Sequence, residues 1–146
     1  MKVALFSDLH LDSPFVWAGS EGARKRRQAL RDTLVRIIDL ALEQKVDAIC
    51  CGGDLFEHDR VSPDTGMFLK REFERAIDVP VYIAPGNHDW IGPRSLYRQA
   101  EWTPNVHVFD GGLTARQLQD GVTLWGAGHQ RPAGTPNFLD GFEVDR

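Results

Sequence analysis

Short apolar runs alternate with longer amphipathic stretches along most of the chain. The runs at 2–7, 47–51 and 80–84 have the length and apolar content typical of buried strands. An amphipathic stretch covers 24–44, where apolar residues recur at steps of three and four. A second begins at Ser62-Pro63, a serine cap followed by proline at the first helical position. The pattern therefore predicts strands separated by helices.

An α/β domain follows from this order of elements. A short helix is expected over 94–101, with further strands at 106–109 and 122–125 and no clear periodicity after Gly126. Strands joined through helices of this length form βαβ units, so we expect a mainly parallel sheet flanked by helices. Further side chains expected in the interior are Met67, Phe68, Phe73, Ile77, Trp102 and Trp125.

Composition and charge narrow the function classes. With 146 residues, 42% hydrophobic and 26% charged, the chain is typical of one ordinary globular domain. It has no apolar stretch near the ~18 residues of a membrane span and no export signal after Met1, so a cytoplasmic protein is expected. The net charge of −4 argues against a protein that coats nucleic acid, but not against a metal-dependent nuclease. The adjacent Cys50 and Cys51 are expected to be buried free thiols.

Three polar clusters stand at the ends of predicted strands. Asp8 and His10 follow the first strand, Asp54 follows the second, and Asn87-His88-Asp89 follows the third. Parallel strands present their carboxyl ends at one edge of the sheet, where ligands bind. We therefore expect the three clusters to meet there.

These side chains suit divalent metal ions. Two carboxylates, one imidazole and one carboxamide favour Mn²⁺, Fe or Zn²⁺, and no thiolate joins them. Asp8 and His10 are two residues apart, which lets both reach one ion from an extended chain. Asp54 could bridge two ions through its two oxygens, and Asn87 could hold the second. His88 would then be free to contact a phosphate or protonate a leaving oxygen.

The motifs Asp8-Leu9-His10, Gly53-Asp54 and Gly86-Asn87-His88-Asp89 together resemble those of the calcineurin-like metallophosphoesterase superfamily. The resemblance implies half of that superfamily's αββα sandwich and a site for two divalent ions. It implies that Asp8, His10, Asp54 and Asn87 are metal ligands. It also implies that His88 is catalytic and that Asp89 orients it.

The flanking residues narrow the resemblance to one branch. The segments 8–15, 53–56 and 105–109 look like the bacterial SbcD-type DNA exonucleases and their YhaO-like members. This likeness implies cleavage of DNA phosphodiesters with Mn²⁺ as the expected metal. Glu57 departs from the branch, because some of its nucleases have histidine at that position.

A second departure concerns the later metal ligands. The superfamily adds a later histidine and a Gly-His-x-His motif, and neither is present within residues 1–146. His129 lacks the required spacing. We interpret residues 1–146 as the N-terminal portion of such a domain, incomplete at its C-terminal side. Its metal binding is then expected to be weak unless another chain, in a homodimer or from a partner, fills the gap.

Two alternatives to a nuclease stay open. The chain could be a small-molecule phosphodiesterase or phosphatase of the same superfamily. It could also be an inactive fragment or a non-catalytic binding scaffold, since the later histidines are missing. The basic run 24–27 and the aromatic residues Phe15, Trp17 and Trp90 could touch nucleic acid. A solvated helix face for the basic run and loop packing for the aromatic residues are the favoured interpretations.

Overall fold

A four-stranded sheet lies at the centre of the computed structural model, which describes residues 1–143. Its strands are β1 (Val3–Phe6), β2 (Ala48–Cys51), β3 (Val81–Ile83) and β4 (Val106–Val108), in the spatial order β1-β2-β3-β4. Each neighbouring pair is parallel. The predicted parallel sheet is confirmed, and all four strands end at the same edge.

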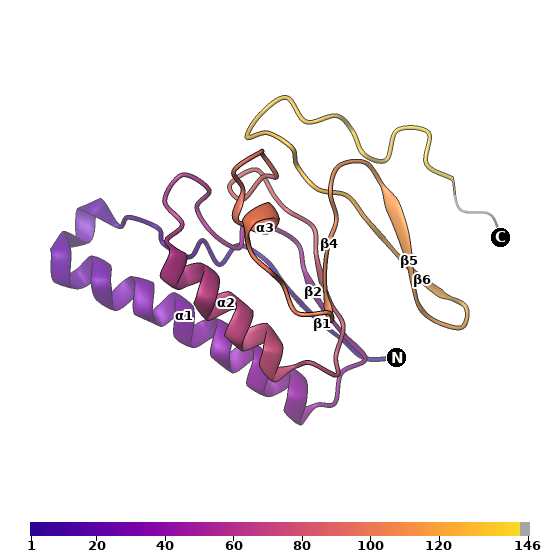
Figure 1. Cartoon of the computed structure of the whole chain (residues 1–146), viewed down its shortest axis with the longest axis horizontal. Helices are drawn as coiled ribbons and strands as arrows, with labels where there is room; N and C mark the ends of the chain where they lie inside the picture. Colours follow the sequence, from indigo (N-terminus) through magenta and orange to yellow (C-terminus); the bar gives the residue numbers. More distant parts are fainter. Residues whose placement is uncertain (144–146) are drawn as a thin grey trace.

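Two long helices connect the strands and cover one face of the sheet (Figure 1). α1 (Gly19–Glu43) follows the 3₁₀ turn η1 (Val16–Ala18) and begins before the predicted Arg24, because its polar first turns carry no apolar period. α2 (Pro63–Arg75) begins as predicted, with the Ser62 hydroxyl accepting a hydrogen bond from the Thr65 amide at 3.2 Å. α3 (Leu96–Gln99) is a single turn. Within residues 1–143, no helix is long and apolar enough to cross a membrane.

A separate β-hairpin follows the parallel sheet. β5 (Thr114–Gln119) and β6 (Val122–Gly126) pair antiparallel and lie on the side of the sheet away from α1 and α2 (Figure 1). The sequence predicted β6 but not β5. Polar residues fill most of β5 and its side chains are only slightly buried, so no apolar pattern marks this strand.

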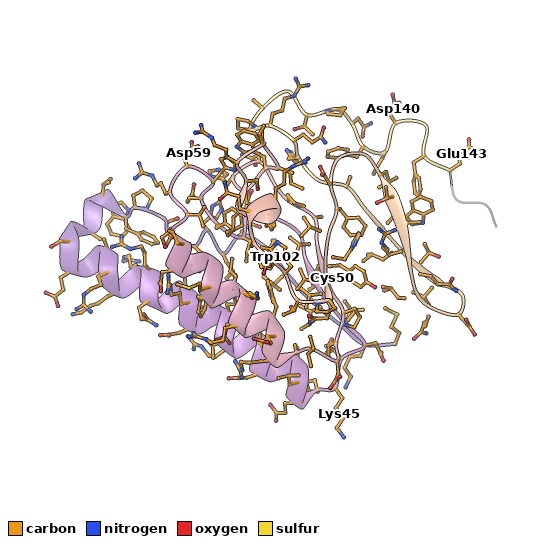
Figure 2. All side chains as sticks on the ribbon, in the orientation of Figure 1. Lys45, Cys50, Asp59, Trp102, Asp140 and Glu143 are labelled. Carbon is orange, nitrogen blue, oxygen red and sulfur yellow. The ribbon has the colours of Figure 1, made fainter. Side chains whose placement is uncertain are left out.

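The core lies between the two helices and the sheet (Figure 2). Its completely buried side chains include Leu34 and Ile38 of α1, Leu69 and Phe73 of α2, and Ile49, Val81 and Ile83 of the sheet. Trp102 is partly buried against this core, and Phe68 is buried as expected.

Three residues expected inside are instead exposed. Met67 is 67% exposed because it lies on the outer side of α2, next to the inward-facing Phe68. Ile77 is 45% exposed because it lies beyond the end of α2. Trp125 is 43% exposed on the hairpin, where its ring contacts Phe142 rather than the core. The apolar character of these three residues predicted that they would be buried. Whether a side chain is buried depends instead on whether it faces a neighbouring element.

Both cysteines are free thiols, as predicted, and only one is fully buried. Cys51 faces the core, whereas Cys50 is half-buried. Burial raises the pKa of the Cys51 thiol to about 12. The thiol is therefore neutral at physiological pH and is a packing group.

Candidate metal centre

The loops that follow β1 and β2 run side by side beyond the sheet and carry the first two clusters. The amide of Asp8 donates to the Gly53 carbonyl at 3.0 Å, and that of His10 donates to the Asp54 carbonyl at 2.9 Å. An isolated parallel bridge between Leu11 and Phe56 continues the pairing. The sheet thus extends as paired loops, and these loops bring Asp8, His10 and Asp54 together.

The backbone at these three residues is left-handed. Asp8, His10 and Asp54 have φ values of 58°, 46° and 52°. Residues other than glycine adopt this region rarely and at a cost, and such strain is concentrated at functional sites. The chain at Asp8 and His10 is therefore not extended, which differs from the expectation, yet both side chains reach the same cluster.

Two glycines allow the loop after β3 to approach. Gly53 has φ 100°, and a Cβ added to it would lie 2.5 Å from the Gly86 amide nitrogen and 2.7 Å from the Ala84 carbonyl oxygen. No side chain fits in that space. Gly53 and Gly86 therefore let the second and third clusters lie against each other.

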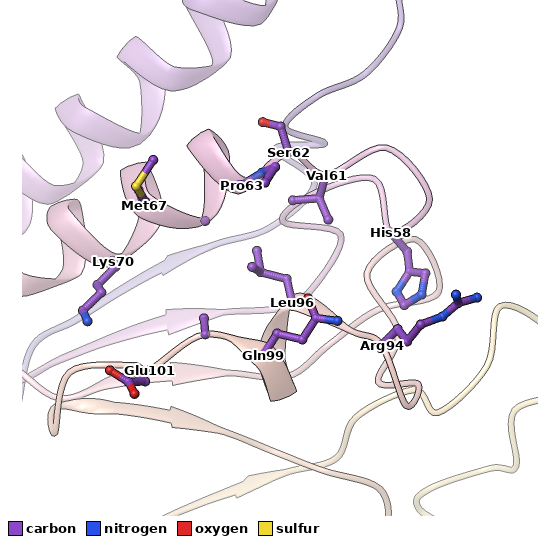
Figure 3. Close-up of a pocket in the computed structure, with 12 residues that line it drawn as sticks. His58, Val61, Ser62, Pro63, Met67, Lys70, Arg94, Leu96, Gln99 and Glu101 are labelled. Atoms are coloured by element: carbon purple, nitrogen blue, oxygen red, sulfur yellow. The ribbon is translucent and has the colours of Figure 1, made fainter.

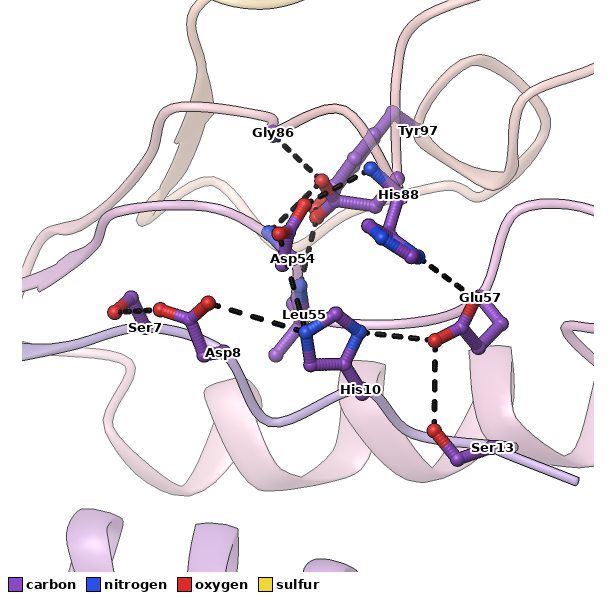
Figure 4. Close-up of polar contacts among 11 residues, drawn as sticks. Ser7, Asp8, His10, Ser13, Asp54, Leu55, Glu57, Gly86, His88 and Tyr97 are labelled. Atoms are coloured by element: carbon purple, nitrogen blue, oxygen red, sulfur yellow. Dashed lines mark hydrogen bonds and ion pairs between the residues drawn. The ribbon is translucent and has the colours of Figure 1, made fainter. Parts of the chain in front are cut away.

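Asp8, His10 and Asp54 converge at the carboxyl edge of the sheet (Figure 4). One ligand atom from each lies within 4.8 Å of the others. The His10 Nε2 atom is 3.9 Å from Asp8 Oδ1 and 3.9 Å from Asp54 Oδ2, too far for hydrogen bonds. Two carboxylates and one imidazole nitrogen facing one another at this spacing fit a divalent cation.

Asn87 and His88 lie beside this cluster on the exposed loop after β3. The His88 amide donates to Asp54 Oδ1 at 2.9 Å, and the two imidazole rings of His10 and His88 meet edge to face at 4.7 Å. Asn87 and His88 also line a cavity of about 330 Å³. The structure thus brings all three predicted clusters to one open site.

Glu57 is a member of the site that the sequence marked only as a departure. Its carboxylate contacts His10 Nδ1 at 2.9 Å and His88 Nδ1 at 3.0 Å (Figure 4). Ser13 Oγ donates to the same carboxylate at 3.4 Å. With Nδ1 donating to Glu57, the His10 ring turns its Nε2 atom toward the carboxylates of Asp8 and Asp54. A carboxylate behind a metal-binding histidine fixes the tautomer in this way.

Glu57 and His88 each stabilise the charged form of the other. Burial acts to raise the pKa of Glu57, but the hydrogen bonds from His88 and His10 bring that pKa below its usual value. The hydrogen bond to Glu57 raises the pKa of His88. The ionised carboxylate therefore favours a protonated His88.

Asp89 connects the loops rather than orienting the His88 ring. It is completely buried, and its carboxylate accepts from the amides of Asp54, Leu55 and Gly86 at 3.0, 2.9 and 2.6 Å. Tyr97 donates its hydroxyl to the same carboxylate at 2.5 Å. Burial raises the pKa of Asp89, and these four donors oppose that shift. The expectation that Asp89 orients His88 needs correction, because the His88 ring is held by Glu57.

His129 and Trp17 lie outside the cluster. His129 has its Nδ1 2.8 Å from Thr135 Oγ1, and its backbone pairs with the loop after β3 through Pro85 and Ile91. Two groups of side chains within residues 1–143 could hold a metal ion, and His129 is in neither of them. The groups are Asp8, His10 and Asp54, and His10, Glu57 and His88. Trp17 is 70% exposed, with the Arg26 guanidinium 4.4 Å from the centre of its ring.

Three polar clusters that meet at the carboxyl edge of a parallel sheet are the arrangement expected of a metallophosphoesterase. The chain belongs to this class: the family model of the calcineurin-like phosphoesterases matches residues 1–143. The chemistry of the family is metal-dependent hydrolysis of phosphoesters. The expected superfamily and half-sandwich are thereby confirmed.

A curated relative gives a closer similarity. The chain is 38% identical over 112 residues to a protein of Bacillus subtilis (strain 168) named "Uncharacterized metallophosphoesterase YhaO". The aligned part is 73% of this chain and 27% of that protein. The chain therefore spans about a quarter of the relative's length.

Proposed function

We propose that this protein is a two-metal phosphodiesterase and that its substrate is DNA. The observation that carries the proposal is the convergence of Asp8, His10 and Asp54 beside the loop of Asn87 and His88. The similarity to the YhaO-like and SbcD-type branch supports DNA as the substrate.

Each site residue has a distinct role in this proposal. Asp8, His10, Asp54 and Asn87 would hold two divalent ions. Asp54 lies between the neighbouring clusters, because its Oδ2 faces His10 Nε2 at 3.9 Å and its Oδ1 accepts a hydrogen bond from the His88 amide. Mn²⁺ is the expected metal, since carboxylate, imidazole and amide ligands suit it. Such ions supply Lewis acidity, which generates a nucleophile from water and neutralises phosphate charge.

His88 acts on the phosphate side of the site. Its side chain is 45% exposed and its Nδ1 is held by Glu57, so the other ring nitrogen is available to substrate. Held as a cation, it would donate a hydrogen bond to a phosphate oxygen and a proton to the leaving oxygen. Asp89 supports this chemistry indirectly, because it holds the loops of Asp54 and Gly86 in place.

The test compares two substrates with Mn²⁺ present. Hydrolysis of bis(4-nitrophenyl) phosphate reports phosphodiesterase chemistry, and cleavage of a single-stranded oligonucleotide reports nuclease activity. Asp54→Asn should abolish both, while Asp32→Asn on the exposed side of α1 should change neither.

The outcomes separate the alternatives. Hydrolysis of the aryl ester without cleavage of any DNA would overturn the nuclease assignment and favour a small-molecule phosphodiesterase. A wild-type protein that binds no Mn²⁺ in calorimetry and cleaves neither substrate would support the non-catalytic scaffold.

A further inference from the structure

A groove of about 450 Å³ adjoins the candidate site between α2, α3 and the loop that carries His58 (Figure 3). We infer that this groove binds the nucleotide next to the scissile phosphate, so that the protein binds nucleic-acid chains more tightly than isolated phosphodiesters. The inference rests on the proposed function and adds a substrate subsite to it. Pockets for small ligands span roughly 300–1,000 Å³, so a nucleotide is a suitable occupant.

The groove and the candidate site are neighbours that share His58 as a lining residue. This residue lines both the groove and the smaller cavity that contains Asn87 and His88. Its ring stacks on Trp90 at 4.2 Å, and its backbone amide donates to the His88 carbonyl at 2.8 Å. A phosphate at His88 would therefore have its neighbouring nucleotide within reach of the groove.

One end of the groove is suited to an anion. Arg94 lies beside His58 at that end, and no salt bridge in the described part of the chain involves Arg94 (Figure 3). Lys70 and Glu101 lie at the other end, where the carboxylate offsets the ammonium charge. The net positive charge thus favours a phosphate at the Arg94 end, nearest the candidate site.

The wall between the two ends is apolar. Val61, Met67 and Leu96 line it, and Met67 is exposed to water in this structure. A Cβ added to Gly66 would lie 2.9 Å from Leu96 Cδ1, so the Leu96 side chain packs directly against α2 at this wall. An apolar surface beside a free guanidinium matches the two parts of a nucleotide, its base and its phosphate.

The experiment separates chain binding from chemistry. Arg94→Gln should raise KM for a single-stranded oligonucleotide about tenfold, the effect of losing one charged hydrogen bond, and leave hydrolysis of bis(4-nitrophenyl) phosphate unchanged. Met67→Ser should act in the same direction by removing apolar contact. Arg36→Gln, a substitution on the exposed side of α1, is the matched control and should alter neither substrate.

Binding of a fluorescent single-stranded oligonucleotide, followed by anisotropy, tests the groove without any turnover. Arg94→Gln should weaken it about tenfold while Arg36→Gln does not. Equal binding by wild type and Arg94→Gln, or no binding by wild type, would overturn the subsite. If the same wild-type protein hydrolyses the aryl ester, the phosphodiesterase proposal is supported even when the subsite fails. If it binds the oligonucleotide but does not hydrolyse the aryl ester, the phosphodiesterase proposal fails and the subsite does not.

Discussion

The carboxylate of Glu57 contacts the imidazole rings of both His10 and His88, and it thereby connects the proposed metal cluster to the neighbouring open cavity. His10 faces the carboxylates of Asp8 and Asp54, while His88 faces the open cavity. Both rings use Nδ1 toward Glu57, and no hydrogen bond within residues 1–143 engages either Nε2. A change at Glu57 should therefore alter both metal binding and substrate chemistry.

Replacing Glu57 tests whether its hydrogen bond positions His10, a proposed metal ligand. Glu57→Gln should weaken Mn²⁺ binding at least about tenfold in calorimetry, because His10 loses the carboxylate that fixes its tautomer. Glu21→Gln, on the exposed first turn of α1, is the control and should bind as wild type does. Unchanged affinity in Glu57→Gln would show that the contact does not position His10.

The same variant tests the charge of His88 in the metal-free protein. The pKa of His88 lies above its ordinary value of 6.5 because of its hydrogen bond to Glu57. A pKa raised on folding contributes stability that is present below the unfolded-state value and lost as pH rises through the folded-state value. Glu57→Gln removes the carboxylate that raises the pKa of His88. An NMR titration of His88 should therefore give a lower pKa in Glu57→Gln than in wild type. Equal values would contradict the proposed pairing.

At the scale of elements, the site depends on how two strand-end loops are joined. The loops after β2 and β3 meet through Gly53 and Gly86, whose backbones approach too closely for a Cβ. Asp89 then ties them together by accepting from amides on both loops. Tyr97 on α3 completes its hydrogen bonds, so the short helix also contributes to the site.

Asp89→Asn should lower the free energy of unfolding by about 2–3 kcal/mol, measured by urea denaturation. The amide cannot accept from every donor around it and leaves buried groups unpaired. Tyr97→Phe removes a single donor and should cost about 1.5 kcal/mol. A loss in Asp89→Asn no greater than in Tyr97→Phe would mean that the backbone contacts add little.

At the scale of the whole molecule, metal binding should stabilise the fold. The proposed ligands come from loops after β1, β2 and β3, so a bound ion would connect elements that are distant in the sequence. An ion that binds only the folded state adds about 2.7 kcal/mol at a concentration 100 times its Kd.

Mn²⁺ should therefore raise the Tm in thermal denaturation, and EDTA should reverse the rise. Asp54→Asn should remove the effect, because Asp54 lies in the cluster and contacts the His88 loop. A Tm in wild type that does not respond to Mn²⁺ would count against the metal centre.

Much of the fold could be predicted because periodicity and caps are local signals. The strands β1 to β4 and the start of α2 at Ser62 were recognisable in this way. The start of α1 and strand β5 were not, since polar residues there form secondary structure that packing stabilises. Met67 and Trp125 were placed inside for their apolar character, although burial depends on which face meets a neighbour.

The sequence by itself determined the class of the protein and the positions of the motif residues, because three motifs at three strand ends must meet at one edge of a parallel sheet. Only the tertiary structure decided which side chains act on one another. In the folded chain Glu57 contacts the His88 ring, and the buried Asp89 carboxylate accepts a hydrogen bond from the Leu55 amide of the loop after β2. These contacts join residues more than 30 positions apart, and their geometry depends on left-handed loops that no local pattern specifies.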